Sequence, residues 1–460
     1  MKTLMFISLA FATVVNAADF KVGVARVNIT PPTPFWLSGY AARTNPAPTA
    51  RTELWAKALV IQDPAGARAV IVTTDLIGLP AEVSEVVAER LKRDENLSRA
   101  ALVLNSSHTH SGPAVWPNLR VMFDFTPDEA ERVKQYAQKL TDDLVSVARQ
   151  ALRDLQPATL AFGRGTAGFA INRRQPLPTG VRIGLNTNGP VDHSVPVLRV
   201  TAPDGGLRAV LFAYACHNTT LGGDFYQVDG DYAGAAQREL EKAHPGATAL
   251  FMMLCGGDQN PNPRGKVEHV EQYGRELASA VEQVLKGNLA AVRPPIRAAH
   301  QVISLDFAPH TREQFEAELK DASVFKQRRA RLMLEAYDRG QPIRQLAYPV
   351  QAIRFGGDLT VLALGGEVVV DYSIRARRDF PGENLVVAGY CNDVACYIPS
   401  LRVLREGGYE PVDSMIYYAQ PGSLAENVQE SIFRAVREVM GKVNATAAAG
   451  GPASPSGSPR

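Results

Sequence analysis

Residues 101–113 read Ala101-Leu102-Val103-Leu104-Asn105-Ser106-Ser107-His108-Thr109-His110-Ser111-Gly112-Pro113, an apolar run followed by a polar loop that contains two histidines. The apolar part predicts a buried strand, and Gly112-Pro113 predicts the point where the chain turns. Because strand side chains alternate between faces, we expect His108 and His110 to project from the same side of the strand end. Two imidazoles so placed suit a metal or proton-transfer site, although histidines at strand ends also serve as hydrogen-bonded structural groups.

Apolar runs of strand length recur along the chain and alternate with helical patterns. We expect strands at residues 20–29, 54–61, 69–73, 101–104, 159–162, 195–200, 207–213, 248–254, 302–307, 359–364 and 385–388. We expect helices at 83–93, 126–155, 232–243, 268–285, 312–337 and 423–440. The second of these begins with Thr126, Pro127 and Glu129, which form a capping-box sequence. The alternation predicts an α/β fold of mixed sheets with flanking helices.

The two ends of the chain differ in composition from the rest. Lys2 precedes an apolar run from Leu4 to Val15, and Val15 and Ala17 are the small residues that a signal peptidase requires. We therefore expect a signal peptide at 1–17 and a secreted or periplasmic protein. Residues 18–444 form one expected domain, and the Ala/Gly/Pro/Ser-rich stretch 445–460 predicts a disordered tail.

Composition excludes several classes of partner. The formal net charge is only +2, which gives no reason to expect binding to nucleic acid. Beyond the N-terminal run, no stretch approaches the roughly 18 apolar residues of a membrane span. Of the four cysteines, Cys391 and Cys396 are close enough in sequence to bridge a small loop, whereas Cys216 and Cys255 follow strand-like runs as small buried residues do.

Three further apolar runs are followed by polar residues that could take part in catalysis or bind a metal. His217 follows one run, the glycine-rich loop 256–262 with Asp258 follows another, and Glu367 follows a third. Active sites of α/β proteins gather at one end of the sheet, so these residues are candidates for a shared site. Each also has a structural explanation: a hydrogen-bonded ring for His217, a turn-forming carboxylate for Asp258 and a cap for Glu367.

Taken in order, these motifs resemble the neutral/alkaline ceramidase family, specifically its N-terminal zinc amidase domain. The resemblance extends over nearly the whole expected mature chain, and its most specific element is His108-Thr109-His110-Ser111-Gly112-Pro113. The other similar motifs are Val22 to Pro31, Thr74-Asp75, Ile171-Asn172-Arg173, Asp192 to Val200, Cys216-His217-Asn218-Thr219, Gly230-Asp231-Tyr232, Gly257-Asp258, Gly366-Glu367, Tyr397-Ile398 and Tyr409-Glu410.

The resemblance implies a ligand set and a set of catalytic residues. A zinc ion would be held by His108, His217, Glu367 and Tyr397. His110 would manage a proton, and Arg173 and Tyr409 would stabilise an oxyanion. Supporting groups near the metal would be Asp75 and Asp231. A site of this composition would also accept other divalent ions.

Two departures from the family pattern bear on the activity. The family carries Gly-Asp-x-Ser-Pro-Asn, but Asn260 stands here in place of the serine. An amide side chain cannot act as a nucleophile, so Asn260 is expected to donate a hydrogen bond at the site, while zinc-activated water remains available. Because the sequence stops after the part that resembles the catalytic domain, we also expect this protein to lack the family's C-terminal immunoglobulin-like domain.

The implied function is hydrolysis of an amide bond, in N-acylsphingosine or a related N-acyl substrate, by zinc-activated water. The expected partner is a small-molecule or lipid substrate, with possible transient contact with a membrane surface. One alternative is a hydrolase of an ester, lactone or short amide. Another is a catalytically silent metal protein that binds a glycan or a lipid headgroup.

Overall fold

The computed structural model describes residues 19–445. The expected signal peptide at residues 1–17 lies outside the described residues, as do residues 446–460 of the expected tail. No helix within 19–445 combines the length and the apolar character that a bilayer span requires.

The larger sheet has the strand order β12-β10-β9-β6-β1-β3-β4-β5, with β14 paired to β6. Its pairs β4–β5 and β10–β12 are parallel and the others antiparallel, so the sheet is mixed. Its strands are β1 (Phe20–Asn28), β3 (Trp55–Gln62), β4 (Arg68–Thr74), β5 (Leu102–Ser106), β6 (Gln156–Thr166), β9 (Ser194–Thr201), β10 (Leu207–Tyr214), β12 (Thr248–Met253) and β14 (Ala290–Val292).

A second sheet has the order β15-β16-β17-β19 and packs face to face with the larger one. Its strands are β15 (Ile296–Asp306), β16 (Gln345–Phe355), β17 (Leu359–Leu364) and β19 (Leu385–Ala388). Three small pairings complete the strands: β2 (Thr49–Ala50) with β11 (Gln227–Val228), β7 (Ala170–Leu177) with β8 (Gly180–Asn186) and β13 (Gln259–Pro261), and β18 (Glu367–Val368) with β20 (Tyr397–Ile398).

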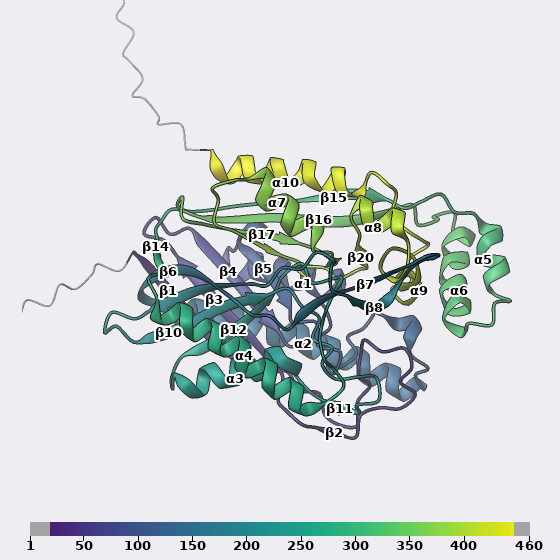
Figure 1. Cartoon of the computed structure of the whole chain (residues 1–460), viewed down its shortest axis with the longest axis horizontal. Coiled ribbons are helices and arrows are strands. Elements are labelled where there is room, and N and C mark those ends of the chain that lie inside the picture. The colour runs from purple at the N-terminus through teal and green to yellow at the C-terminus, as the bar shows by residue number, and fades with distance from the viewer. Residues whose placement is uncertain (1–18, 446–460) are drawn as a thin grey trace, which may run out of the picture.

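Helices cover the outer faces of both sheets, which gives four layers in the order helix, sheet, sheet, helix (Figure 1). The larger sheet is covered by α1 (Ala81–Glu95), α2 (Pro127–Arg153), α3 (Asp231–Ala243) and α4 (Val267–Lys286). The second sheet is covered by α7 (Asp371–Asp379) and α10 (Val428–Asn444). The remaining helices are α5 (Arg312–Glu318), α6 (Val324–Asp338), α8 (Leu401–Glu406) and α9 (Ser414–Tyr417), with short turns η1 (Arg99–Ala101), η2 (Arg120–Met122) and η3 (Tyr409–Asp413).

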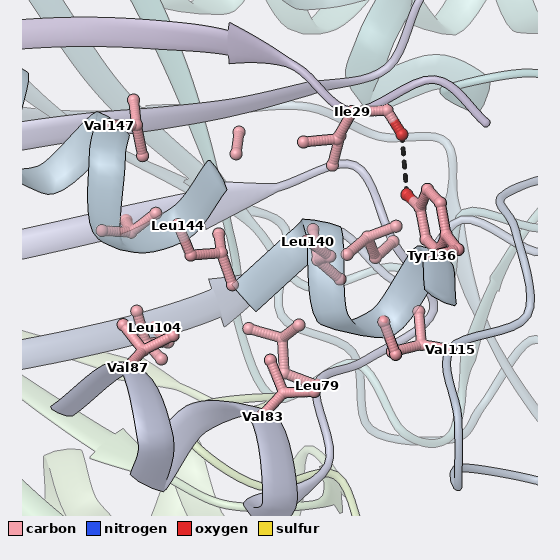
Figure 2. Packing of buried hydrophobic residues seen from close by; sticks show 14 of the residues in the cluster. Ile29, Leu79, Val83, Val87, Leu104, Val115, Tyr136, Leu140, Leu144 and Val147 are labelled. Atoms are coloured by element: carbon pink, nitrogen blue, oxygen red, sulfur yellow. Dashed lines mark hydrogen bonds between the residues drawn. The ribbon is translucent and has the colours of Figure 1, made fainter. Parts of the chain in front are cut away.

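Central strands are apolar on both faces because both faces are covered. In β3, Ala58 and Val60 pack toward α2, while Leu59 and Ile61 pack toward the second sheet. Figure 2 shows the helical side of this arrangement, where Leu140 and Leu144 of α2 lie against the strands and α1. The capping box predicted at the start of α2 is confirmed, including its reciprocal bonds between Thr126 and Glu129.

The α/β class and the positions of the predicted strands are confirmed, but one predicted helix is wrong. Instead of a single helix over 312–337, the chain forms α5 and α6. The break follows from local hydrogen bonds: Ser323 accepts from the amide of Lys326 as the cap of α6, and Asp321 accepts from the Ser323 amide. The possible bridge between Cys391 and Cys396 is also absent, because all four cysteines, which lie within the described residues, are buried free thiols.

Candidate metal centre

Asn105 joins three strand ends beneath the site. From β5, its side-chain amide donates to the carbonyls of Met253 and Gly389, and its side-chain oxygen accepts from the Met253 amide. The ends of β5 and β12 and the residue that follows β19 are thereby fixed relative to one another. Loops that leave these ends carry the histidines, so the bonds of Asn105 set the position of the site.

The two histidines of the 101–113 stretch do meet, but not for the predicted reason. Strand β5 ends at Ser106, and His108 has a positive φ of 65°, so strand alternation does not apply to it. Backbone bonds place the rings instead: the His108 amide donates to Leu76 and the His110 amide donates to Asn218. The Nε2 atoms of His108 and His110 lie 3.1 Å apart.

His108, His217 and Glu367 converge on one point although they lie far apart in sequence. Oε2 of Glu367 is 2.9 Å from Nε2 of His108 and 3.0 Å from Nε2 of His217. Nδ1 of each ring contacts a backbone carbonyl, that of Ile77 at 2.5 Å and that of Gly256 at 2.8 Å. A ring that donates from Nδ1 presents a lone pair at Nε2, which is the arrangement of metal-ligating histidines.

This geometry leaves three acceptor atoms facing one another. With Nδ1 protonated on both rings, neither Nε2 atom of His108 or His217 carries a proton to share with the Glu367 carboxylate. Burial lowers the pKa of His217 to about 3, so that ring is neutral at pH 7. Three buried lone-pair donors of this kind fit a divalent cation between them.

Tyr397 supplies a fourth donor atom, its hydroxyl oxygen, to the cluster. It is the direct register partner of Glu367 in the parallel pairing of β18 with β20. Its hydroxyl lies 3.1 Å from Nε2 of His217 and accepts a 2.9 Å hydrogen bond from Nη2 of Arg173. Four ligands at zinc distances in a tetrahedron stand roughly 3.3 Å apart, so the spacings around the cluster are close to those of such a shell.

Three histidines form a second candidate group of metal ligands, which shares His108 and His217 with the cluster above. One ring nitrogen from each of His108, His110 and His217 lies within 4.8 Å of the others. The His110 ring packs on Gly39, where a Cβ would lie only 2.4 Å from its Nδ1 and where φ is +94°. Glycine is therefore required at this position for the ring to occupy its place beside His108.

Arg173 is held by a buried carboxylate. Its Nε donates to Oε1 of Glu410 at 2.9 Å, and Glu410 also pairs with Arg174. Arg173 is only 4% exposed, and its Nη1 lies 3.4 Å from Oδ1 of Asn260. Burial alone would lower its pKa, but the neighbouring Tyr397 and Glu410 raise it well above the usual value, so Arg173 stays charged.

A cavity of about 440 Å³ opens onto this cluster. Among the residues that line it are His110, Arg173, Asn260, Tyr397 and Tyr409, which brings all four predicted catalytic residues to one pocket. The ring of Tyr409 lies edge-on to that of Tyr397, with centroids 5.7 Å apart. The wall also includes Gly39, Tyr40, Ala41, Ala42, Met122, Ile183, Thr219, Gly223, Arg264 and Tyr417.

Three predicted acidic residues serve the scaffold. Asp75 accepts from the amide of Trp55 and the side chain of Gln237, and Asp231 accepts from the amides of Leu221 and Tyr232. Asp258 accepts from the Val370 amide and the Asn172 side chain, which ties the loops of Glu367 and Arg173 together. These contacts position the strand ends, and Asp75 and Asp231 are not grouped with the four proposed ligands.

Sequence reasoning missed several residues that contact the site directly, among them Tyr418 and Glu410. Tyr418 donates a 2.5 Å hydrogen bond to Oε1 of Glu367, and Glu410 anchors Arg173. The sequence did contain a signal for Glu410. It is an acidic residue directly after the predicted site residue Tyr409, and a carboxylate there can pair with the predicted site arginine. Tyr418 gave no signal, since it is one of two adjacent tyrosines in an otherwise ordinary stretch.

Comparison with known proteins places this geometry in context. The family described as "Neutral/alkaline non-lysosomal ceramidase, N-terminal" matches residues 20–288. The neutral ceramidase of Drosophila melanogaster is 26% identical over 287 residues, which cover 58% of this chain and 39% of that protein. Neutral ceramidase B of Dictyostelium discoideum is 28% identical over 226 residues, which cover 46% of this chain and 31% of that protein. The matched segments thus span less than half of each curated relative.

Solved structures show the same fold over a longer stretch. The neutral ceramidase from Pseudomonas aeruginosa superimposes with a TM-score of 0.72 at 18% identity, covering 92% of this chain and 74% of that one. A structure described as a ceramidase complexed with C2 gives a TM-score of 0.71, also at 18% identity, covering 94% of this chain and 77% of that one.

Proposed function

This chain belongs to the neutral/alkaline non-lysosomal ceramidase family, and we propose that it is a zinc-dependent hydrolase that cleaves an amide bond in N-acylsphingosine or a related N-acyl compound. The observation that carries the proposal is the convergence of His108, His217 and Glu367, with Oε2 of the carboxylate 2.9 and 3.0 Å from the two Nε2 atoms. Tyr397 completes the ligand set through its hydroxyl.

The donor set fits zinc chemically. Two neutral imidazoles, a carboxylate and a phenol oxygen supply nitrogen and oxygen ligands of the kind zinc accepts. A zinc ion held there would polarise a carbonyl and lower the pKa of water to about 7. We assign Glu367 and Tyr397 as ligands rather than His110. Glu367 lies within 3.0 Å of both Nε2 atoms and Tyr397 lies 3.1 Å from that of His217, whereas His110 contacts the cluster through His108.

His110 is placed to hold and move a proton. Burial and the neighbouring rings of His108 and His217 keep its pKa well below the usual value, so the ring is neutral at pH 7 and can accept a proton. Its position on the pocket wall brings the ring to the substrate side of the cluster. A proton taken up there can be returned to the leaving amine.

Arg173 and Tyr409 supply donors for negative charge that develops on the carbonyl oxygen. The guanidinium is fixed by Glu410 before substrate arrives, and fixed donors in a buried site stabilise an oxyanion without reorganising. Asn260 lies beside Arg173 on the same wall and adds an amide to this side of the pocket. Its side chain cannot form an acyl-enzyme, so the reaction is direct hydrolysis.

A panel of substrates tests this function. Zinc-loaded protein should hydrolyse N-acylsphingosine or short N-acyl amides, and chelation or His110→Ala should abolish turnover. The 440 Å³ pocket is small for a lipid with two long tails, which favours the shorter amides, esters and lactones as the second candidate class. If the zinc-loaded protein hydrolyses none of these compounds, it is a silent metal-binding member of the family.

We also propose that the protein acts outside the cytoplasm, in the periplasm or secreted. The support is the sequence of residues 1–17, with its Lys2, apolar run and small residues. Cell fractionation with mass spectrometry of the N-terminus tests this proposal, and the expected mature chain begins at Ala18. Recovery of the uncleaved chain in the cytoplasm would contradict it.

A further inference from the structure

The substrate pocket has an unbalanced positive charge. Its described lining residues include two cations, Arg173 and Arg264, and no aspartate or glutamate. The charge of Arg173 is matched by Glu410 behind it. Arg264 forms no ion pair within residues 19–445, and its one side-chain hydrogen bond there goes to the hydroxyl of Tyr40 at 3.5 Å. The guanidinium therefore keeps most of its donors available.

Arg264 is held at a defined place on the pocket rim. The neighbouring Gly265 amide donates to Thr220 at 2.6 Å, which fixes the loop that carries the arginine. Tyr40, which Arg264 contacts, is itself fixed by a 2.8 Å hydrogen bond from its hydroxyl to the Leu221 carbonyl. The ring of Tyr40 lies 4.9 Å from that of His110, so Arg264 stands on the His110 side of the pocket.

A further cation, Arg43, lies behind this side of the pocket without lining it. Within residues 19–445, Arg43 is 4% exposed and donates only to backbone carbonyls, including those of Ser38 and His110 at 2.9 and 2.6 Å. Its guanidinium lies 4.9 Å from the centre of the Tyr40 ring. Asp224, whose charge acts on Arg43, and Asp231, whose charge acts on Tyr40, do not line the pocket. Low-dielectric walls with one sign of charge attract a ligand of the opposite sign.

We propose that the preferred substrate is an amide that carries a carboxylate, such as an N-acyl amino acid, and that Arg264 binds this carboxylate. The inference rests on the proposed amide hydrolysis. A planar guanidinium with free donors matches a carboxylate in shape and charge. The apolar acyl chain would contact the apolar part of the wall, where Met122 and Ile183 lie and where Ile183 is 48% exposed without substrate.

The test compares two substrates that differ only in charge. An N-lauroyl amino acid and its carboxamide share the acyl chain and the amide bond, but only the first carries an anion. With zinc-loaded wild type, kcat/KM should be about 1.5- to 5-fold higher for the carboxylate, which is the range expected for an ion pair with a solvent-exposed arginine. Raising the salt concentration should reduce this preference because Arg264 is exposed.

Variants assign the preference to one residue. Arg264→Ala should raise KM for the carboxylate substrate and leave the carboxamide unchanged, while Arg264→Lys should keep part of the preference. Lys266→Ala is the matched control, because Lys266 is an exposed cation two residues away that does not line the pocket. Equal kcat/KM values for the two substrates, or an equal loss of both in Arg264→Ala, would overturn the inference.

A binding measurement separates this inference from the proposed function. Calorimetry of zinc-loaded His110→Ala with the N-lauroyl amino acid reports affinity without turnover. The double variant, with Arg264→Ala added to His110→Ala, should bind the N-lauroyl amino acid more weakly and the carboxamide equally well. This result supports the role of Arg264 even if wild type hydrolyses none of the compounds. Unchanged binding of the carboxylate would overturn it, even if neutral amides are hydrolysed.

Discussion

The hydroxyl of Tyr418 donates a 2.5 Å hydrogen bond to Oε1 of Glu367, while Oε2 of the same carboxylate faces His108 and His217. The bond fixes which oxygen points at the cluster. Carboxylate ligands oriented in this way by an outer hydrogen bond hold a metal more tightly than free ones.

Tyr418→Phe should therefore weaken zinc binding about 10- to 100-fold, because it removes the bond and keeps the ring. Competition with a chromophoric chelator measures the affinity, and circular dichroism checks the fold. Tyr417→Phe is the control for metal affinity, because within residues 19–445 the ring of this adjacent tyrosine packs against Phe325 and Tyr409 and its hydroxyl forms no hydrogen bond with Glu367. An unchanged affinity in Tyr418→Phe would show that Glu367 needs no such orientation or is not a ligand.

Asn260→Ala should slow catalysis without abolishing it. The side-chain oxygen of Asn260 lies 3.4 Å from Arg173 and 3.3 Å from the Thr219 hydroxyl, so its loss removes weak contacts and no nucleophile. Loss of one hydrogen bond of about 0.5–1.5 kcal/mol predicts a two- to twelvefold fall in kcat. Steady-state kinetics measure the fall, and trapping with hydroxylamine should reveal no acyl-enzyme. Complete inactivity would contradict direct hydrolysis.

Stability should depend on pH through Asp393. Burial, together with Glu82 and Glu85 nearby, raises the pKa of this carboxyl to about 7, and its Oδ1 accepts from the amide of Ala81. A carboxyl whose pKa is raised in the folded state stabilises the fold when protonated, and that contribution is lost as pH rises from about 4 through 7. The loss is at most about 1.4 kcal/mol per pH unit.

Asp393→Asn keeps the acceptor for Ala81 and removes the titration. Its melting temperature should exceed that of wild type at pH 8, and the two should approach each other below pH 5. Scanning calorimetry at several pH values measures the difference, in which groups common to both proteins cancel. A difference that stays constant from pH 4 to pH 8 would contradict the raised pKa.

Leu144→Ala should destabilise the fold by about 2–5 kcal/mol, because this side chain is fully buried between α2 and the larger sheet (Figure 2). Denaturant unfolding measures the loss. Gln138→Ala on the exposed side of the same helix is the control and should change stability by no more than about 0.5 kcal/mol. A loss at Leu144 as small as that of the control would mean that α2 does not pack as described.

Local sequence signals predicted much of the fold. Apolar runs such as that of β3 are long and flanked by turns, and the capping box at Thr126 has a direct hydrogen-bond meaning. Features that depend on the rest of the molecule were missed. Strand β16 and the hairpin of β7 with β8 were not predicted, because their sequences lack a clear alternation of apolar and polar residues. The helical pattern of residues 312–337 looks continuous in the sequence, but the hydrogen bond between Asp321 and Ser323 interrupts it.

The candidate site was predicted mainly from the resemblance. His108, His217, Glu367 and Tyr397 come from four distant segments, and no spacing rule relates them. What brings them together is tertiary: the bonds of Asn105 between strand ends, and the pairing of β18 with β20. Partners that act through those ligands, such as Tyr418, become visible only once the chain is folded.

Metal analysis of the purified protein tests the ligand set most directly. Inductively coupled plasma mass spectrometry of zinc-equilibrated wild type should find one zinc per chain, His108→Ala and Glu367→Ala should lose it, and His110→Ala should retain it. Wild type without zinc, or His108→Ala at full occupancy, would contradict the metal site. Loss of zinc in His110→Ala with retention in Glu367→Ala would instead assign the ion to the three histidines.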